Sequence, residues 1–297
     1  MLHITNGDSV VARFRDGGIP GQYLAWADPL HDGPVPETAN LLELAYIRAR
    51  AFAGFGWGGE SAILQTFLSK IQALSSFRDH DEVVLWFEHD LFDELLVWQL
   101  LDWFRGQNLG AVRLSMVRID SHPEISPFFG LGQLTGPQLA ALLPTRKPVS
   151  KQQMDAASTN WRQFCSETPP AGPKRLLEEY PSVGDGLSRL ERELLLAAEQ
   201  GPASRETLYR RAMAFEECPW GDASVFLRLD GLKSATNPAI ASDCSLTPAG
   251  RLLLDGGADW VALQGGIDRW IGGVHLVGPS PAYRWAPGSG TLIGNPT

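Results

Sequence analysis

Short apolar runs alternate with helix-spaced apolar positions along the first 125 residues. Strand-like runs cover residues 2–5, 22–26, 83–87 and 112–119. Between them, apolar side chains recur every three or four positions, which predicts helices at residues 10–14, 41–52, 61–74 and 91–104. The run from Val83 to Phe87 is continuous, as in a buried central strand. Strands separated by helices predict an α/β fold with a Rossmann-like open parallel sheet.

Beyond residue 125 the pattern becomes mainly helical. Helical spacing predicts helices at residues 136–143, 152–164, 204–217 and 222–232. Ser188 and Glu191 have the spacing of a capping box at the start of a further helix. A strand-like return at 239–246 follows the last three helices, and this order predicts a winged-helix-like unit. The Gly- and Trp-rich stretch 267–285 predicts a β-hairpin.

These patterns divide the chain into four parts. They are a Rossmann-like α/β domain at 1–125, a helical connector with a Pro/Gly break at 126–184, a winged-helix-like domain at 185–256 and a Gly/Trp-rich hairpin at 257–297. The 44% of hydrophobic residues predicts a packed core. Neither a membrane span nor a signal peptide is readable, so we expect a cytoplasmic protein with no membrane partner. Three distant cysteines without a C-x-x-C pair argue against disulfides and a thiolate zinc site.

Charge disfavours a nucleic-acid partner. The net charge is −9, and residues 1–125 hold nine lysines or arginines against seventeen acidic residues. An acidic segment of this kind suits a metal ion or a cationic ligand, or it is simply a solvated surface. Residues 185–256 hold eight basic and eleven acidic side chains, whereas a nucleic-acid reader normally shows a basic face. A protein partner stays open for this part.

Polar residues follow each strand predicted in the first 125 residues. In open α/β sheets, ligands bind beyond the carboxyl ends of the strands. We therefore expect the polar clusters to converge on one edge of the sheet and to share a pocket for a small-molecule ligand. The clusters are Asn6, Asp8 and Ser9; Asp28; Glu88, His89 and Asp90; and Asp120 and His122.

The turn after the first predicted strand has features of an anion site. Gly7 permits a tight turn, and a helix N-terminus can receive a phosphate. One glycine is not a dinucleotide fingerprint. The Gly-Asp-Ser triplet also resembles the nucleophile block of lipase-like hydrolases, but their C-terminal D-x-x-H partner is missing. The simpler alternative is that Asp8 or Ser9 caps the helix. The candidate ligand-binding residues are Asn6, Gly7, Asp8, Ser9 and Asp28.

Residues 88–94 concentrate four carboxylates and one imidazole at the end of the most strand-like run. Oxygen-rich clusters suit Mg²⁺ or Mn²⁺, and crowded carboxylates can have raised pKa values that suit acid–base chemistry. The spacing of His89 supports no zinc motif. The alternative is an ordinary helix start, with Asp90 as N-cap and Asp93 in the first turn. Glu88, His89 and Asp90 are the candidate catalytic residues.

Five motifs spread over the chain resemble an uncharacterised bacterial family. They are H-x-x-N-G-D-S at 3–9, L-W-F-E-H-D-L-F-D-E at 85–94, G-L-G-Q-L at 130–134, G-L-S-R-x-E-R at 186–192 and D-R-W-I-G-G-V-H-L at 268–276. The family carries the domain of unknown function 1835 with its usual C-terminal companion domain. The resemblance implies a bacterial cytoplasmic protein with a Rossmann-like N-terminal domain, and it implies no activity.

Two hypotheses follow for the function. The first is a small-molecule-binding α/β enzyme of hydrolase or transferase type, with a pocket at the carboxyl edge of the sheet and Mg²⁺ or Mn²⁺ as a candidate cofactor. The second is a noncatalytic regulatory protein, in which the N-terminal domain senses a ligand and the winged-helix-like unit binds a protein or DNA partner. The sequence leaves open whether the chain is catalytic.

Overall fold

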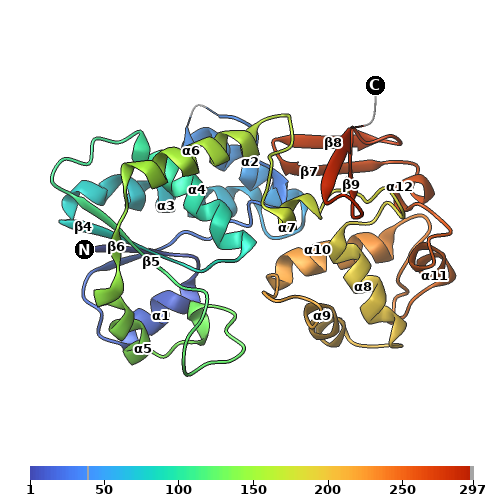
Figure 1. The fold of residues 1–297 in the computed structure, drawn as a ribbon, viewed down its shortest axis with the longest axis horizontal. Coiled ribbons are helices and arrows are strands. Elements are labelled where there is room, and N and C mark those ends of the chain that lie inside the picture. The colour runs from blue at the N-terminus through green and yellow to red at the C-terminus, as the bar shows by residue number, and fades with distance from the viewer. Residues whose placement is uncertain (39, 295–297) are drawn as a thin grey trace. The chain divides into compact units, whose positions relative to one another are not determined.

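The computed structural model describes residues 1–38 and 40–294, which form two compact units, Met1–Pro170 and Ala171–Thr297 (Figure 1). The boundary lies inside the Pro/Gly break at 168–173. Residues 126–170 belong to the first unit and do not form a separate connector. The physical reason is packing, because α6 (Lys151–Cys165) lies against α4 (Leu91–Arg105) and buries Phe164 and Cys165.

A five-stranded sheet in the order β2-β1-β4-β5-β6 forms the centre of the first unit. Its strands are β1 (Leu2–Thr5), β2 (Gln22–Ala25), β4 (Glu82–Phe87), β5 (Arg113–Arg118) and β6 (Lys147–Pro148). The first four are parallel and β6 is antiparallel to β5. The α/β class and the mostly parallel sheet are therefore confirmed. The sequence analysis did not predict β6, because a two-residue strand carries no periodicity. The short β3 (Gly33–Pro34) lies outside this sheet.

Strand β4 lies inside the sheet because its side chains suit burial on both faces. All six of its residues are buried, and β1 and β5 flank it. Ile4 of β1 pairs with Leu85 of β4. Glu82 is the polar exception, and Arg146 and Ser115 hydrogen-bond its carboxylate at 2.8 Å each. These bonds hold the pKa of Glu82 down at about 2.

Helices cover both faces of the sheet (Figure 1). One face carries α1 (Asp8–Asp16) and α5 (Gly136–Leu142), and the other carries α2 (Leu41–Gly54), α3 (Glu60–Ser75), α4 and α6. Helices α1 and α5 approach closely at two glycines: a Cβ on Gly17 would lie 2.3 Å from the carbonyl oxygen of Gly136. The described residues of this unit also contain three short 3₁₀ turns, at Ser76–Asp79, Leu131–Gln133 and Leu143–Thr145.

The order in which strands are added to the sheet changes side at β1. From β1 the chain passes to β2 on one side, and it then crosses over to β4 on the other side of β1. In doubly wound sheets, ligands bind at the carboxyl ends of the two strands that flank such a point. Asn6 and Glu88 directly follow these two strands. The topology therefore places both residues where a ligand site is expected.

The second unit contains six helices among its described residues. They are α7 (Lys174–Leu177), α8 (Arg189–Glu199), α9 (Arg205–Met213), α10 (Asp222–Ser234), α11 (Pro248–Leu254) and α12 (Trp260–Leu263). The predicted capping box is present, since Ser188 accepts from the backbone N–H of Glu191 and the Glu191 side chain accepts in return. The expected strand-like return at 239–246 reduces to one bridge between Ile240 and Leu246.

Two antiparallel strand pairs follow these helices. They join β7 (Ile267–Gly272) to β8 (Val274–Gly278) and β9 (Tyr283–Ala286) to β10 (Thr291–Gly294). The hairpin predicted in the Gly/Trp-rich stretch is confirmed by β7 and β8. In the described part of both units, every helix is too short or too polar to cross a membrane.

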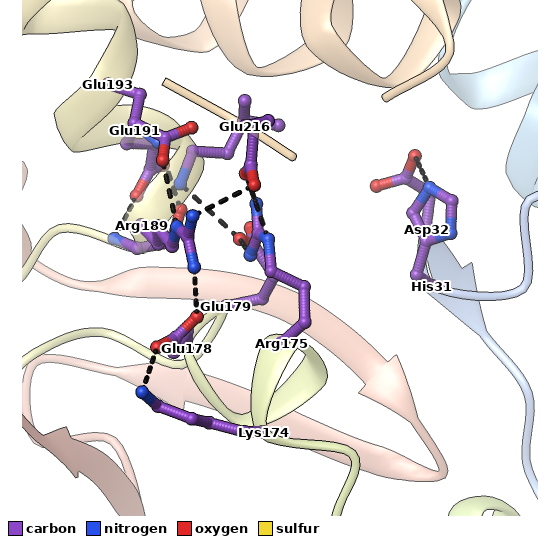
Figure 2. Close-up of polar contacts among 12 residues, drawn as sticks. His31, Asp32, Lys174, Arg175, Glu178, Glu179, Arg189, Glu191, Glu193 and Glu216 are labelled. Carbon is purple, nitrogen blue, oxygen red and sulfur yellow. Dashed lines mark hydrogen bonds and ion pairs between the residues drawn. The ribbon is translucent and has the colours of Figure 1, made fainter. Parts of the chain in front are cut away.

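An ion-pair network fixes α7 and α8 to the loop that follows α9 (Figure 2). Arg175 and Arg189 both bind Glu216, at 2.5 Å and 3.0 Å, and Arg189 also binds Glu178 and Glu193 at 2.8 Å each. Burial and the neighbouring Glu216 charge raise the pKa of Glu193 to about 7. Each of these side chains forms an ion pair within the network. We therefore interpret the network as a stabilising feature of the second unit.

Candidate functional site

The site is built on the turns that follow β1 and β4. One backbone turn ends in α1, which begins at Asp8, and the other ends in α4, which begins at Leu91. Asn6 and Glu88 therefore extend from the sheet between two helix N-termini. This arrangement follows from parallel strands, because the carboxyl ends of neighbouring strands lie at one edge.

One amide group joins two carboxyl side chains in this site. Asn6 Nδ2 donates to Glu88 Oε2 at 2.8 Å and to Asp93 Oδ1 at 2.9 Å. The backbone N–H of Glu88 donates to Asp93 Oδ2 at 2.5 Å. The backbone N–H of Leu131 donates to the other oxygen of Glu88. Both carboxyls are therefore fixed in orientation by donors from three separate segments.

Asp90 supplies a third carboxyl. It is the N-cap of α4, and its Oδ1 accepts from the backbone N–H of Asp93 at 2.7 Å. Glu88, Asp90 and Asp93, here called the carboxyl triad, each offer an oxygen, and these oxygens lie within 4.8 Å of one another. A carboxylate has about four lone-pair positions, so the hydrogen bonds described leave each member able to bind a cation. Oxygen ligands of this type fit Mg²⁺ or Mn²⁺.

Burial sets the electrostatics of the triad. Glu88 is 7% exposed and Asp93 is fully buried. Burial, together with the smaller effect of the Asp90 charge, raises the pKa of Glu88 to about 7, although the hydrogen bonds from Leu131 and Asn6 act in the opposite direction. Burial also raises the pKa of Asp93, with the Glu88 charge as the second cause. The pKa of Asp90 is raised by burial as well. The triad therefore retains a proton near neutral pH.

The turn that starts α1 leaves the helix N-terminus without a side-chain cap. Gly7 is the N-cap residue and makes no side-chain hydrogen bond. The alternative that Asp8 or Ser9 caps this helix is therefore wrong; both side chains are exposed in the first turn. The free backbone N–H groups favour an anion at this end, close in sequence to Asn6.

A tight turn at residues 130–133 covers Glu88. Gly130 has φ +155°, which lies in the region that favours glycine, and a Cβ there would lie 2.7 Å from Glu88 Oε1. The side chain of Gln133 holds the turn by accepting from the backbone N–H of Gly130 at 3.1 Å. Only glycine at position 130 lets the backbone approach the carboxyl closely enough for the Leu131 bond.

The structure separates the other candidates from the triad. Asp28 is buried in an ion pair, with Arg48 Nη2 at 2.5 Å from its Oδ1, and it takes no part in the triad. His89 is mostly exposed, and its partial loss of solvent and the Arg118 charge lower its pKa. Asp120 is exposed and accepts a hydrogen bond from Ser121. The expectation that all strand-end clusters form one shared site is corrected: the described contacts join only the clusters after β1 and β4.

Two contributors to the site were missed from the sequence. Asp93 belongs to the predicted carboxylate cluster at 88–94, but it is not among the candidate site residues, because its spacing from Asp90 also fits an ordinary helix start. Asp90 does cap that helix. The sequence does contain one signal for Asp93: it lies three residues after Asp90, a spacing that places two side chains on the same face of a helix. The second contributor is the backbone N–H of Leu131, which lies 43 residues after Glu88 in the sequence. The G-L-G-Q-L motif at 130–134 is visible in the sequence, but its contact with Glu88 depends on tertiary packing.

No family model matches this chain, and a search of curated proteins finds no match to it. The functional argument therefore depends on the geometry and chemistry of the site.

Proposed function

We propose that the chain is a small-molecule-binding α/β enzyme of hydrolase or transferase type, with the carboxyl triad as its reactive centre and Mg²⁺ or Mn²⁺ as its cofactor. The proposal depends on one observation: Glu88 and Asp93 are both buried, and the Asn6 amide donates hydrogen bonds to both carboxyls. Buried carboxyls with raised pKa values cost stability, and such groups concentrate at functional sites. Their position at the sheet crossover is where ligands bind in this fold class.

The residues of the site have distinct roles in this proposal. Asp90 and Asp93 hold the cation together with Glu88, and a bound cation would polarise a substrate oxygen. Asn6 and the Leu131 N–H keep the carboxyls in one orientation. With a pKa of about 7 in the metal-free protein, Glu88 exchanges its proton near neutral pH, so it can move a proton as metal and substrate enter. The uncapped α1 N-terminus favours a phosphate or another anionic group on the substrate.

A panel of chromogenic esters tests this proposal. The full chain is assayed with p-nitrophenyl phosphate, bis(p-nitrophenyl) phosphate and p-nitrophenyl acetate, in Mg²⁺, in Mn²⁺ and in EDTA. We expect metal-dependent turnover that falls by about 100-fold or more in E88Q and D93N. E60Q, which removes an exposed carboxylate from α3, is the matched control. Turnover that is absent with every substrate, or equal in E88Q and E60Q, contradicts the proposal.

The resemblance to the family with the domain of unknown function 1835 adds a fold expectation and no activity. We also propose that α8, α9, α10 and the Ile240–Leu246 bridge form a winged-helix-like unit. Its third helix offers little to DNA, because Arg228 is 9% exposed. A protein partner is therefore favoured for this unit. A mobility-shift assay of the full chain with mixed DNA should show no complex, and a shift resisting 0.2 M salt would contradict this.

A further inference from the structure

The ion-pair network of the second unit contains more carboxyls than cationic groups (Figure 2). Among the described residues, Arg175 and Arg189 bind four carboxyls, which belong to Glu178, Glu179, Glu193 and Glu216. Lys174 adds a largely exposed ammonium, 3.4 Å from Glu178. With every carboxyl ionised, these groups would carry an excess of negative charge. Buried like charges repel, so the excess favours one bound proton.

Glu193 has the fewest hydrogen-bond donors of the four carboxyls. Its Oε1 accepts from Arg189 Nε at 2.8 Å, whereas its Oε2 is buried and accepts no hydrogen bond from the described residues. Glu216 accepts three hydrogen bonds from the two guanidiniums. Glu178 has a donor on each of its oxygens, and Glu179 has two donors on one oxygen. The distribution of donors therefore favours Glu193 as the protonated carboxyl.

The side chains of Glu193 and Glu216 are direct neighbours. Both bind the guanidinium of Arg189, and the two carboxyls lie within hydrogen-bonding reach of each other. Two ionised carboxylates cannot share a hydrogen bond, because neither carries a proton. A proton on Glu193 lets it donate to Glu216. Burial and the Glu216 charge raise the pKa of Glu193 to about 7, which agrees with this placement of the proton.

Charged side chains elsewhere on α8 and on the elements packed against it act on different groups. They are Arg192 with Asp185, Arg251 with Glu199, Arg211 with the backbone oxygen of Gly201, and Arg228 and Arg269 with Glu191. The charged groups that determine the ionisation of Glu193 are therefore Arg189, Arg175 and Glu216.

Glu216 is the buried anchor of the loop at 214–219, which connects α9 to the buried Trp220. Its side chain is 5% exposed, and its ion pairs with Arg175 and Arg189 fix the loop to α7 and α8. Four of its neighbours in the loop are exposed: Ala214, Phe215, Glu217 and Cys218. Loss of the Glu216 ion pairs would therefore release the loop from these helices.

We propose that Glu193 and Glu216 form a pH-dependent latch for the loop at 214–219. While Glu193 holds a proton, it donates to Glu216 and the loop stays closed on α7 and α8. When Glu193 loses the proton, two adjacent carboxylates compete for Arg189 and repel each other. Glu216 then leaves, because it belongs to the loop, whereas Glu193 is fixed within α8. This proposal depends neither on the carboxyl triad nor on a metal.

Hydrogen exchange of the full chain at pH 6 and pH 8 tests the latch. The readout is the protection factor, which corrects for the intrinsic pH dependence of exchange, at the amides of Phe215 and Glu216; both donate to backbone oxygens at the end of α9. The pKa of Glu193 is about 7 in the closed loop and near its ordinary 4.5 once the loop opens. The closed loop therefore binds the proton more tightly, and opening should increase about 10-fold from pH 6 to pH 8, mostly below pH 7.

Two variants assign the titration. E193Q keeps an N–H donor for Glu216 and cannot ionise, so protection of the loop should change by less than about twofold between the two pH values. E217Q, which removes an exposed carboxylate from the same loop, is the matched control and should keep the pH dependence of the wild type.

Three results would overturn the proposal. Equal protection of the loop at pH 6 and pH 8 in the wild type excludes the latch, and this measurement needs no variant. A wild-type pH dependence in E193Q assigns the titration to another group. An equal loss of protection in the β7–β8 hairpin shows that the proton stabilises the whole second unit and not the loop in particular.

Discussion

The substitution E88Q tests the electrostatics of the carboxyl triad through the pH dependence of stability. Folding raises the pKa of Glu88 from 4.5 to about 7, so the folded chain binds this proton more tightly than the unfolded chain. The resulting stabilisation is fully present below pH 4.5 and is lost as the pH rises through 7. At 1.36 kcal/mol per pKa unit, the full effect is about 3 kcal/mol, and Glu88 is buried enough for solvent screening to be small.

The assay is urea unfolding of the wild type and E88Q at pH 5 and pH 8, followed by far-UV circular dichroism. The free energy of unfolding of the wild type, relative to E88Q, should fall by about 2–3 kcal/mol between these pH values, with most of the change between pH 5 and pH 7. Glutamine cannot ionise, so E88Q lacks this titration. E60Q controls for the loss of an exposed carboxylate. If the wild type and E88Q change in parallel, Glu88 ionises near its ordinary pKa in the folded chain, which contradicts the raised pKa of this carboxyl.

Three further predictions concern the surroundings of the site. G130A should destabilise the chain by about 1–3 kcal/mol, because its Cβ would lie 2.7 Å from an oxygen of the carboxyl triad. The control is G132A, whose Cβ would be 3.4 Å from its nearest neighbour and which should leave thermal unfolding nearly unchanged. Equal losses of stability in the two variants would contradict this reasoning. R48M should cost about 3–5 kcal/mol in chemical unfolding, since it leaves Asp28 buried and unpaired; a loss below about 1 kcal/mol would refute that role. Burial lowers the pKa of His3, so NMR at pH 6 should show a neutral ring, and a protonated ring would contradict its buried environment.

The sequence predicted the sheet and one part of the site because those features depend on local pattern and strand order. The continuous apolar run of β4 indicates burial whatever surrounds it. The polar turns after β1 and β4 follow from the parallel arrangement, and Asn6, Glu88 and Asp90 do meet there. Strand-end position alone was sufficient for these three residues.

The remaining features of the structure depend on tertiary packing, which the local sequence pattern does not encode. Asp28 also follows a strand, but Arg48 reaches it from α2, twenty residues away, and turns it into a structural ion pair. The Leu131 N–H likewise reaches Glu88 from a turn 43 residues further along the chain, a contact that periodicity does not give.

The central claim is that the carboxyl triad exchanges a proton for a divalent cation. Mn²⁺ titration calorimetry at pH 7, repeated in two buffers of different ionisation enthalpy, measures both the binding and the number of protons released. We predict one Mn²⁺ site per chain that releases about one proton and is lost in E88Q but kept in E60Q. Absence of Mn²⁺ binding, or binding that E88Q leaves unchanged, would contradict the claim.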